Sequence, residues 1–297
     1  MSLLSTQNSS ALVQQLWQRP TLPGDPTTPS GADKADIVPS SIVDLANWLR
    51  VLTKTRLVDK NRPFVVVHRT EGSQTPPCEV SIRLQGFLMK PVLRSLGNWD
   101  GTSHNAWKAV QSLALAGNDS EPWLVTLAQL NNVIKVVTRM VAKANEDAVE
   151  HLFVEEPTTV IPFQRRVFTK SSSLRGDDKH PIPEDAGRHM DTIRKMSSQW
   201  GFGVPLVLGV LQGDIVRPCQ HVVLAEGDFV DVVASLEVVL KRGLPRVHFL
   251  VDRVIQLCPA LPPIPAQVAT NDVEEVVLRR RVHDIFAKGP LPPAAQE

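Results

Sequence analysis

The feature that most constrains the fold of this 297-residue chain is a long apolar stripe over residues 121–152. Ser120 precedes it as a helix N-cap, and Pro122 falls in the first turn, where a missing N–H has no partner to lose. Apolar residues then recur every three or four positions, which is the period of one helix face. The pattern predicts one long helix, and it favours a central core helix over an intermolecular coiled coil. The stripe consists of Leu127, Leu130, Ile134, Val137, Val141, Ala144 and Ala148.

Shorter elements are predicted on both sides of this helix from apolar spacing and from β-branched or alternating segments. Residues 247–257 are apolar throughout and fit either a strand or a helix. The predicted fold class is α+β, mainly helical, with short β-strands in two lobes, one long central helix and flexible arms at both ends. Helices are predicted over residues 41–52, 102–116, 186–200 and 229–241, and strands over residues 64–68, 79–87, 158–168, 204–211 and 215–224.

Proline-rich segments divide the chain into parts. Each arm carries a short apolar helix that cannot bury itself, so it must dock on its own core or on a neighbouring subunit. The expected parts are a flexible N-terminal arm (1–40), an N-terminal lobe with the long helix (41–168), a loop or lobe boundary (169–185), a C-terminal lobe (186–257), and a proline tether with an amphipathic helix (258–297). The expected oligomer contacts are Leu12, Leu16, Trp17, Leu278, Val282, Ile285 and Phe286.

Cysteine usage and the N-terminal segment bear on location. The chain has three cysteines, an odd number, and they are far apart in sequence, so they do not form a disulfide framework. The first residues lack a basic segment followed by an apolar one, and no apolar run is long enough for a transmembrane helix. These features predict an intracellular, cytoplasmic protein.

Motifs for catalysis, metals and phosphates are weak. Gly201 and Gly203 lack the third glycine of a dinucleotide-binding loop. Cys219 and His221, with the later His248 and Cys258, do not have the spacing of a zinc knuckle. We therefore expect no metal and no cofactor, and we assign no catalytic residue. An enzyme site assembled in space around His221, His248 and Asp252 stays open as an alternative.

Charge distribution is the clearest functional signal in a chain whose formal net charge is only +1. Residues 49–94 and 165–175 are rich in basic side chains, and a basic residue recurs every fourth position from 135 to 143. Such stripes can follow a phosphate backbone without reading bases. Because tyrosine is absent, stacking on bases would use tryptophans such as Trp99, Trp107 and Trp200. The candidate RNA-binding residues are Arg50, Lys54, Arg56, Lys60, Arg62, Lys135, Arg139, Lys143, Arg165, Arg166, Lys170 and Arg175.

Together, the arms and the basic patches predict a non-catalytic, self-assembling structural protein that coats RNA without sequence specificity, as a viral nucleocapsid does. Its expected partners are RNA, further copies of itself through arm exchange, and an anionic membrane. The alternative is a matrix or capsid shell protein that acts through protein–protein and membrane contacts. The second alternative is the enzyme with a site between the lobes.

Overall fold

The computed structural model describes residues 38–39, 41–53, 64–69, 79–117, 121–144, 159–171, 180–213 and 215–260. The chain divides into two compact units at residue 260, and all described residues belong to the first. The strands are β1 (Leu49–Thr53), β2 (Phe64–His68), β3 (Ser81–Val92), β4 (Val110–Ala116), β5 (Val160–Arg166), β6 (Phe168–Lys170), β7 (Trp200–Phe202), β8 (Val207–Gln212), β9 (Ile215–Pro218), β10 (Phe229–Lys241) and β11 (Leu244–Cys258). The helices are α2 (Ile42–Trp48), α3 (Glu121–Ala144) and α4 (Met190–Met196), with 3-10 helices η4 (Ser103–Lys108), η7 (Glu184–His189) and η8 (His221–Val223).

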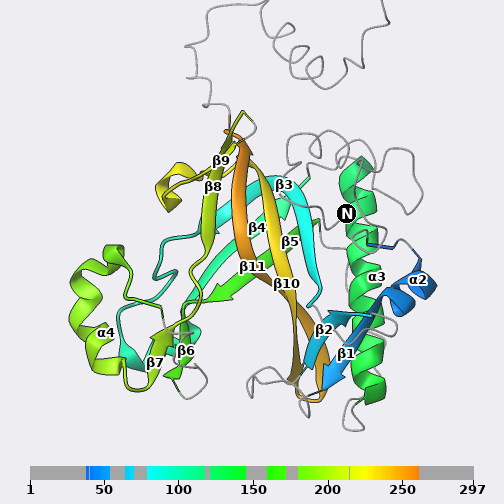
Figure 1. Ribbon diagram of the computed structural model, residues 1–297, viewed down its shortest axis with the longest axis horizontal. Helices are drawn as coiled ribbons and strands as arrows, with labels where there is room; N and C mark the ends of the chain where they lie inside the picture. Colours follow the sequence, from blue (N-terminus) through cyan, green and yellow to red (C-terminus); the bar gives the residue numbers. More distant parts are fainter. Residues whose placement is uncertain are drawn as a thin grey trace, which may run out of the picture. The chain divides into compact units, whose positions relative to one another are not determined.

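Five strands close into a barrel at the centre of the molecule (Figure 1). β3 pairs with β4, β4 with β5, and β10 with both β3 and β11, all antiparallel. β11 closes the ring by running parallel to β5. The β1–β2 pair extends the sheet from β10, and the β8–β9 hairpin extends it from β11. A five-stranded Greek-key barrel with this strand order is an OB-fold.

The barrel strands alternate between a buried face and a more open face. On β10, every second residue from Val230 to Val238 is fully buried. Residues directly opposite one another in a ladder share a face, so Leu84 of β3 and Val251 of β11 join the same core. Leu115 of β4 and Phe163 of β5 continue it around the barrel. The core therefore forms from the period-two pattern of valine and leucine on these strands.

α3 covers one side of the barrel core (Figure 1). Trp123, Val133 and Val137 of this helix are buried, and the indole Nε1 of Trp123 donates to the carbonyl oxygen of Thr159 at 3.0 Å. Gly117 lies so close beneath this indole that a Cβ there would be 2.0 Å from its Cγ, which excludes any side chain. The predicted core helix is confirmed over residues 121–144, and its expected extension to residue 152 lies outside the described part of the chain.

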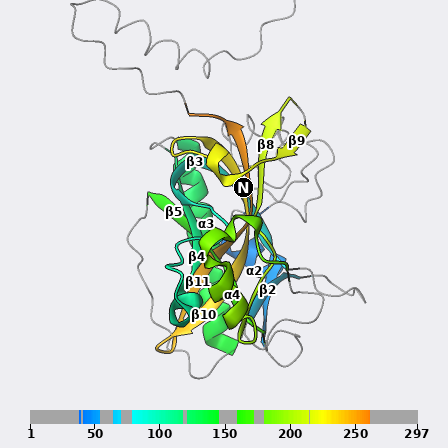
Figure 2. The same ribbon diagram turned by 90° about the vertical axis from the view of Figure 1, so that its left-hand side faces the viewer.

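A second, smaller core lies beside the barrel, and we call it the side cluster. It consists of the β3–β4 loop (residues 93–109, including η4), the β6–β7 pair, η7 and α4. The Phe168 ring lies 4.9 Å from the rings of both Trp99 and Phe202, and Ile193 and Met196 of α4 pack into the same core. Figures 1 and 2 show the side cluster and α3 on opposite sides of the barrel.

The predicted fold class was wrong, because the described residues form a β-barrel and not a mainly helical chain in two lobes. Strands from both predicted lobes pair with one another in one sheet, as β3 does with β10. Residues 229–241 and 110–116 were predicted to be helical, but they are β10 and β4. Both contain apolar residues at alternate positions, which is the strand period that the helical interpretation missed. The expected arms and lobe boundaries lie largely outside the described residues, so the division of the chain stays a prediction.

One ion pair is buried between two barrel strands. Arg83 of β3 and Asp231 of β10 are 2% and 0% exposed, and the Arg83 Nε donates to both carboxylate oxygens at 2.7 Å. Arg253 of β11 is half-buried nearby. Burial lowers the pKa of Arg253, the Asp231 carboxylate opposes this shift, and the charge of Arg83 adds to it. The Asp231 carboxylate therefore attracts both guanidinium groups in this part of the barrel.

No described helix has the length and apolarity that crossing a membrane requires.

Candidate functional site

Ligands of OB-folds, including oligonucleotides, bind on the second and third barrel strands and on the loops that join strands one to two and four to five. In this chain the strands are β4 and β5, and the connections are the β3–β4 loop and the β10–β11 turn. The candidate site therefore comprises the β4–β5 pair, the β3–β4 loop and the β10–β11 turn.

Asp100 organises the β3–β4 loop. Its carboxylate accepts hydrogen bonds from the backbone N–H of Thr102 at 2.9 Å, from the Thr102 hydroxyl at 2.7 Å and from the Asn105 amide at 2.6 Å. These bonds, chiefly those from Thr102, lower the pKa of Asp100 to about 2. The carboxylate is therefore ionised across the ordinary pH range, and it holds the start of η4 in place.

η4 presents a tryptophan to solvent. Ala106 and Ala109 are buried and anchor this short helix, whereas Trp107 between them is 55% exposed. Among the described residues, no other Trp or Phe side chain is classed as exposed. The Nζ of Lys108 lies 5.0 Å from the centre of the Trp107 ring, within the range of a cation–π contact. The loop thus carries an open aromatic surface next to a positive charge.

The open face of β4 and β5 begins two residues after η4 in the chain. Val110, two residues after Lys108, lies opposite Arg166 in the ladder, and Ser112 lies opposite Gln164. Arg166 is exposed, and no described residue forms an ion pair or hydrogen bond with its side chain. We call the surface formed by Trp107, Lys108, Ser112, Gln164 and Arg166 the β4–β5 face.

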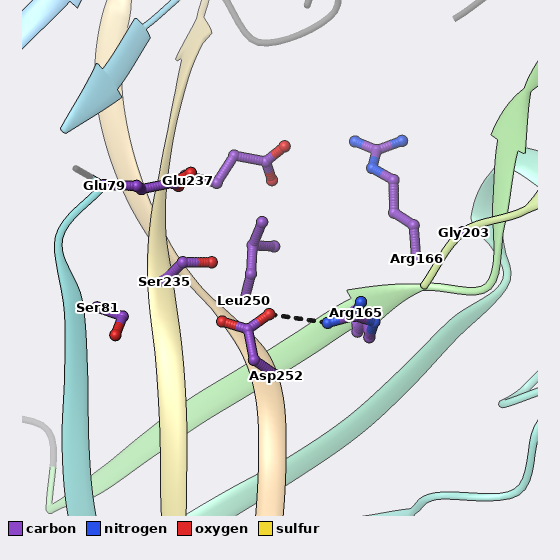
Figure 3. A pocket seen from close by; sticks show the side chains of 9 residues that line it. All are labelled: Glu79, Ser81, Arg165, Arg166, Gly203, Ser235, Glu237, Leu250 and Asp252. Carbon is purple, nitrogen blue, oxygen red and sulfur yellow. Dashed lines mark hydrogen bonds and ion pairs between the residues drawn. The ribbon is translucent and has the colours of Figure 1, made fainter. Parts of the chain in front are cut away.

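A pocket of about 420 Å³ adjoins this face (Figure 3). Ser81, Ser235 and Leu250 contribute hydroxyl and apolar surface to it from β3, β10 and β11. The pocket is also lined by three carboxylates and two guanidinium groups, those of Glu79, Glu237, Asp252, Arg165 and Arg166. Because carboxylates repel phosphate, a phosphate backbone fits the outer β4–β5 face better than the pocket itself.

Arg165 and Arg166 are adjacent in sequence, but the structure uses them differently. Arg165 donates to the carbonyl oxygen of Val204 from Nε at 3.0 Å and from Nη2 at 2.7 Å. Its Nη1 donates to the carbonyl oxygen of Val251 at 2.9 Å and to the carboxylate of Asp252 at 2.8 Å. Arg165 therefore ties the segment after β7 to β11, and only Arg166 of this pair is available to a ligand.

Arg165→Ala is expected to lower the free energy of unfolding by about 2 kcal/mol, because the hydrogen bonds of one charged group to fixed acceptors are lost together. Arg166→Ala, the matched control one residue away, is expected to change it by less than ~0.5 kcal/mol. Urea unfolding followed by circular dichroism measures both values. Equal losses in the two variants would contradict the structural role of Arg165.

The β10–β11 turn is also basic. Arg242 and Gly243 form a two-residue turn in which both have positive φ, +56° and +78°, as in a type I′ hairpin. Gly243 adopts this conformation without strain, and it allows Lys241 and Arg242 to project from the end of the hairpin, where both are exposed.

The remaining predicted RNA-binding residues are distributed over other surfaces or lie outside the described residues. Lys135, Arg139 and Lys143 are exposed on α3, on the other side of the barrel from the side cluster. Arg50 is exposed on β1, and Lys170 is exposed on β6 opposite Trp200. The structure does not describe Lys54, Arg56, Lys60, Arg62 or Arg175, nor the expected oligomer contacts Leu12, Leu16, Trp17, Leu278, Val282, Ile285 and Phe286. Self-association through these contacts stays a prediction.

The residues of the enzyme alternative are not brought together. Asp252 is paired with Arg165, and His248 lies opposite Glu237 near the beginning of β11. η8, which contains His221, is bound to the other end of β11, where the Gln256 amide donates to the Val223 carbonyl at 3.4 Å. Eight strand residues separate the two ends, which is about 26 Å. In the part of the chain that the structure describes, no group of three or more His, Cys, Asp or Glu side chains could hold a metal ion.

Comparisons with known proteins give likenesses of structure alone. No protein-family model and no curated protein matches the sequence. Among solved structures, the chain is similar to gp2.5, a single-stranded DNA-binding protein encoded by bacteriophage T7, with 11% sequence identity and a TM-score of 0.38 over 66% of this chain and 97% of that one. It is also similar to the single-stranded DNA-binding protein of bacteriophage Enc34, with 8% identity and a TM-score of 0.32 over 74% of this chain and 96% of that one. The Enc34 protein in complex with single-stranded DNA gives 9% identity and a TM-score of 0.31 over 71% and 97% of the two chains.

At TM-scores this low, individual residues of this chain are not matched to residues of the phage proteins. The predicted RNA-coating nucleocapsid and the matrix or capsid shell were nevertheless wrong. In the described residues, one closed barrel takes the place of the two separate lobes over which the basic patches were expected to be distributed.

Proposed function

We propose that this chain binds single-stranded DNA without sequence preference, across the β4–β5 face and the two flanking connections. The observation that carries the proposal is the exposed Trp107 beside Lys108, on the loop where an OB-fold binds its ligand. The sequence predicted that the chain binds a nucleic acid. We keep that role and propose DNA as the ligand in place of RNA. Single-stranded DNA is also the ligand named for the phage proteins described above.

The chemistry of the surface favours a single strand. An exposed indole can stack only on a base whose own face is free, and bases in a duplex already stack on one another. Stacking tolerates any sequence because every base has a π-face. The β4–β5 face carries small or neutral polar side chains such as Ser112 and Gln164, which leave room for a strand to lie across the sheet.

Basic side chains supply the contacts to the backbone. Lys108, Arg166, Lys241 and Arg242 lie on the proposed surface or on its flanking turn, and all four are exposed. Each phosphate contact to a single strand contributes about −0.7 to the slope of log K against log salt concentration. Four contacts predict a slope of about −3, so binding should be strong at low salt and should weaken steeply as salt is added.

Fluorescence anisotropy with a labelled oligo(dT) of about 16 nucleotides tests the proposal, since one OB-fold covers at most about that length. The double variant Lys108→Ala/Arg166→Ala is expected to lose at least ~10-fold in affinity and about 1.4 in salt slope. The double variant Lys135→Ala/Arg139→Ala removes the same charge from α3, and it should stay within about twofold of the unchanged protein. Duplex DNA and oligo(U) of equal length serve as competing ligands.

Absence of oligo(dT) binding at low salt would overturn the proposal. A larger loss in the α3 variant than in the Lys108/Arg166 variant would move the site to the other side of the barrel. Tighter binding of duplex DNA than of oligo(dT) would exclude stacking on Trp107 as the basis of recognition.

A further inference from the structure

A second cavity, of about 320 Å³, lies within the side cluster, between the β3–β4 loop and η7. Its lining includes Arg94 and Gly97 from the loop, and Asp185, Arg188 and His189 from η7. Two guanidinium groups therefore face one cavity with a single carboxylate. The pocket that Glu237 lines has the opposite charge balance, since its carboxylates outnumber its guanidinium groups.

Arg94 is held in place through its Nε, and both guanidinium groups keep free donors. The Nε of Arg94 donates to the Gly97 carbonyl oxygen at 2.7 Å, and the Nε of Arg188 lies 3.4 Å from the Nε2 of His189. The terminal nitrogens of both side chains have no hydrogen-bond partner among the described residues. A guanidinium that is fixed through Nε and open at its terminal nitrogens is preorganised for the oxygens of a phosphate.

The walls of the cavity are rigid. The Trp99 Nε1 donates to the Thr102 carbonyl oxygen at 2.9 Å, and the Trp99 ring lies 5.3 Å from the ring of His189. The Asp185 carboxylate accepts from the backbone N–H of Ser95 at 3.4 Å. Gly187, at the turn that presents Arg188, has φ +49° and open space where a Cβ would be. The Ser95–Asp185 hydrogen bond and the Trp99–His189 ring contact therefore join the β3–β4 loop directly to η7, so the two walls of the cavity are held together.

The loop that lines the cavity is hydrogen-bonded to β4, next to the β4–β5 face. The backbone N–H of Asn98, next to Gly97, donates to the Val110 carbonyl oxygen at 3.0 Å, and the Asn98 side-chain oxygen accepts from the Val110 N–H at 2.9 Å. Val110 in turn lies opposite Arg166. The loop backbone at Asn98 is one strand spacing from β4, and β4 is one strand spacing from β5. The two spacings amount to about 10 Å, so one DNA strand can reach both Arg166 and the cavity.

We infer that this cavity binds a backbone phosphate of the same DNA strand, through the terminal nitrogens of Arg94 and Arg188. The inference rests on the proposed function and extends it: the strand leaves the barrel at Arg166, and the side cluster holds its next segment. The group that the cavity recognises is a phosphodiester, which is the same in every nucleotide. The inferred contacts therefore do not distinguish one base from another.

Oligo(dT) titrations at several salt concentrations test this site. The double variant Arg94→Ala/Arg188→Ala is expected to lose about 10-fold in affinity and about 1.4 in salt slope. Asp185→Asn keeps an acceptor for Ser95 but removes the opposing charge, and it should bind about threefold more tightly. Arg194→Ala is the matched control, because this arginine of α4 is also exposed but does not line the cavity, and it should stay within about twofold.

Two further variants separate binding from folding. Arg188→Ala alone leaves the Arg94–Gly97 hydrogen bond intact and should still lower both affinity and salt slope. Arg94→Lys/Arg188→Lys keeps the charge, and it should recover most of the slope. If the unchanged protein binds oligo(dT) but the arginine variants bind with the same affinity and slope, the cavity inference fails and the proposed function stands. If the unchanged protein does not bind oligo(dT), both fail.

Discussion

Trp107→Ala is expected to weaken the binding of oligo(dT) by about 10- to 100-fold, because stacking of one base on an aromatic ring contributes about 1–3 kcal/mol. The indole is more than half exposed, and the helix that carries it is anchored by Ala106 and Ala109. The substitution should therefore leave the unfolding midpoint nearly unchanged. Anisotropy titration at constant salt measures the loss, and the salt slope should stay the same because no charge is removed.

Trp107→Phe is the control, since it keeps an aromatic face and should retain most of the affinity. The same variant isolates the fluorescence of Trp107 from the other five tryptophans of the chain. DNA should quench the emission of the unchanged protein more than that of Trp107→Phe. If Trp107→Ala binds oligo(dT) as tightly as the unchanged protein, the strand does not cross the β3–β4 loop where we place it.

Asp231→Ala is expected to lower the free energy of unfolding by about 3–5 kcal/mol, the usual cost of leaving a buried charge without its partner. Arg83 would keep a full positive charge inside the barrel and would lose the carboxylate that accepts from its Nε. The neighbouring Arg253 would lose the attraction that opposes its burial and would be left beside the charge of Arg83. Urea unfolding at neutral pH measures this loss.

The double variant Arg83→Met/Asp231→Leu separates the cost of an unpaired charge from the loss of the pair. Apolar side chains of similar volume often replace a buried ion pair without loss of stability. The double variant should therefore be more stable than Asp231→Ala. An unfolding midpoint of Asp231→Ala equal to that of the unchanged protein would show that Arg83 finds another partner or reaches solvent.

Local patterns in the sequence predicted several elements correctly. The β-branched segment 64–68 is β2, and most of the alternating segment 79–87 lies in β3. The helix predicted over 41–52 is correct only for α2, because residues 49–52 belong to β1. β10 was missed because Val, Leu and Ala follow one another there in a run that satisfies a helical face as well as an alternating strand. Its buried face becomes evident only when β3 and β11 lie on either side.

The candidate site was less predictable than the strands. Its exposed residues are of the same types as buried or paired residues nearby, and only their surroundings in the fold distinguish them. Arg165 and Arg166 have equal charge, and the one-residue step of a strand turns one toward Val204 and Asp252 and the other toward solvent. Trp99 and Trp107 belong to the same loop, but only one is buried. Arg166 belongs to one of the predicted basic segments and is exposed, and its part in binding stays a prediction. The position of the β3–β4 loop beside a barrel depended on barrel closure, which no local pattern indicates.

The way the barrel closes has a consequence for how the protein is made. β10 and β11 are joined by a two-residue turn and can pair as soon as both exist. β3 and β4 are also consecutive strands, although the longer loop of residues 93–109 joins them. The Arg83–Asp231 pair, by contrast, joins residues 148 positions apart, and Arg165 reaches Val251 across 86 positions. Contacts of such long sequence separation form late and slowly. A nascent chain that has emerged only as far as β5 has its tryptophan loop but no closed barrel, so it should acquire its ligand only after β11 has left the ribosome.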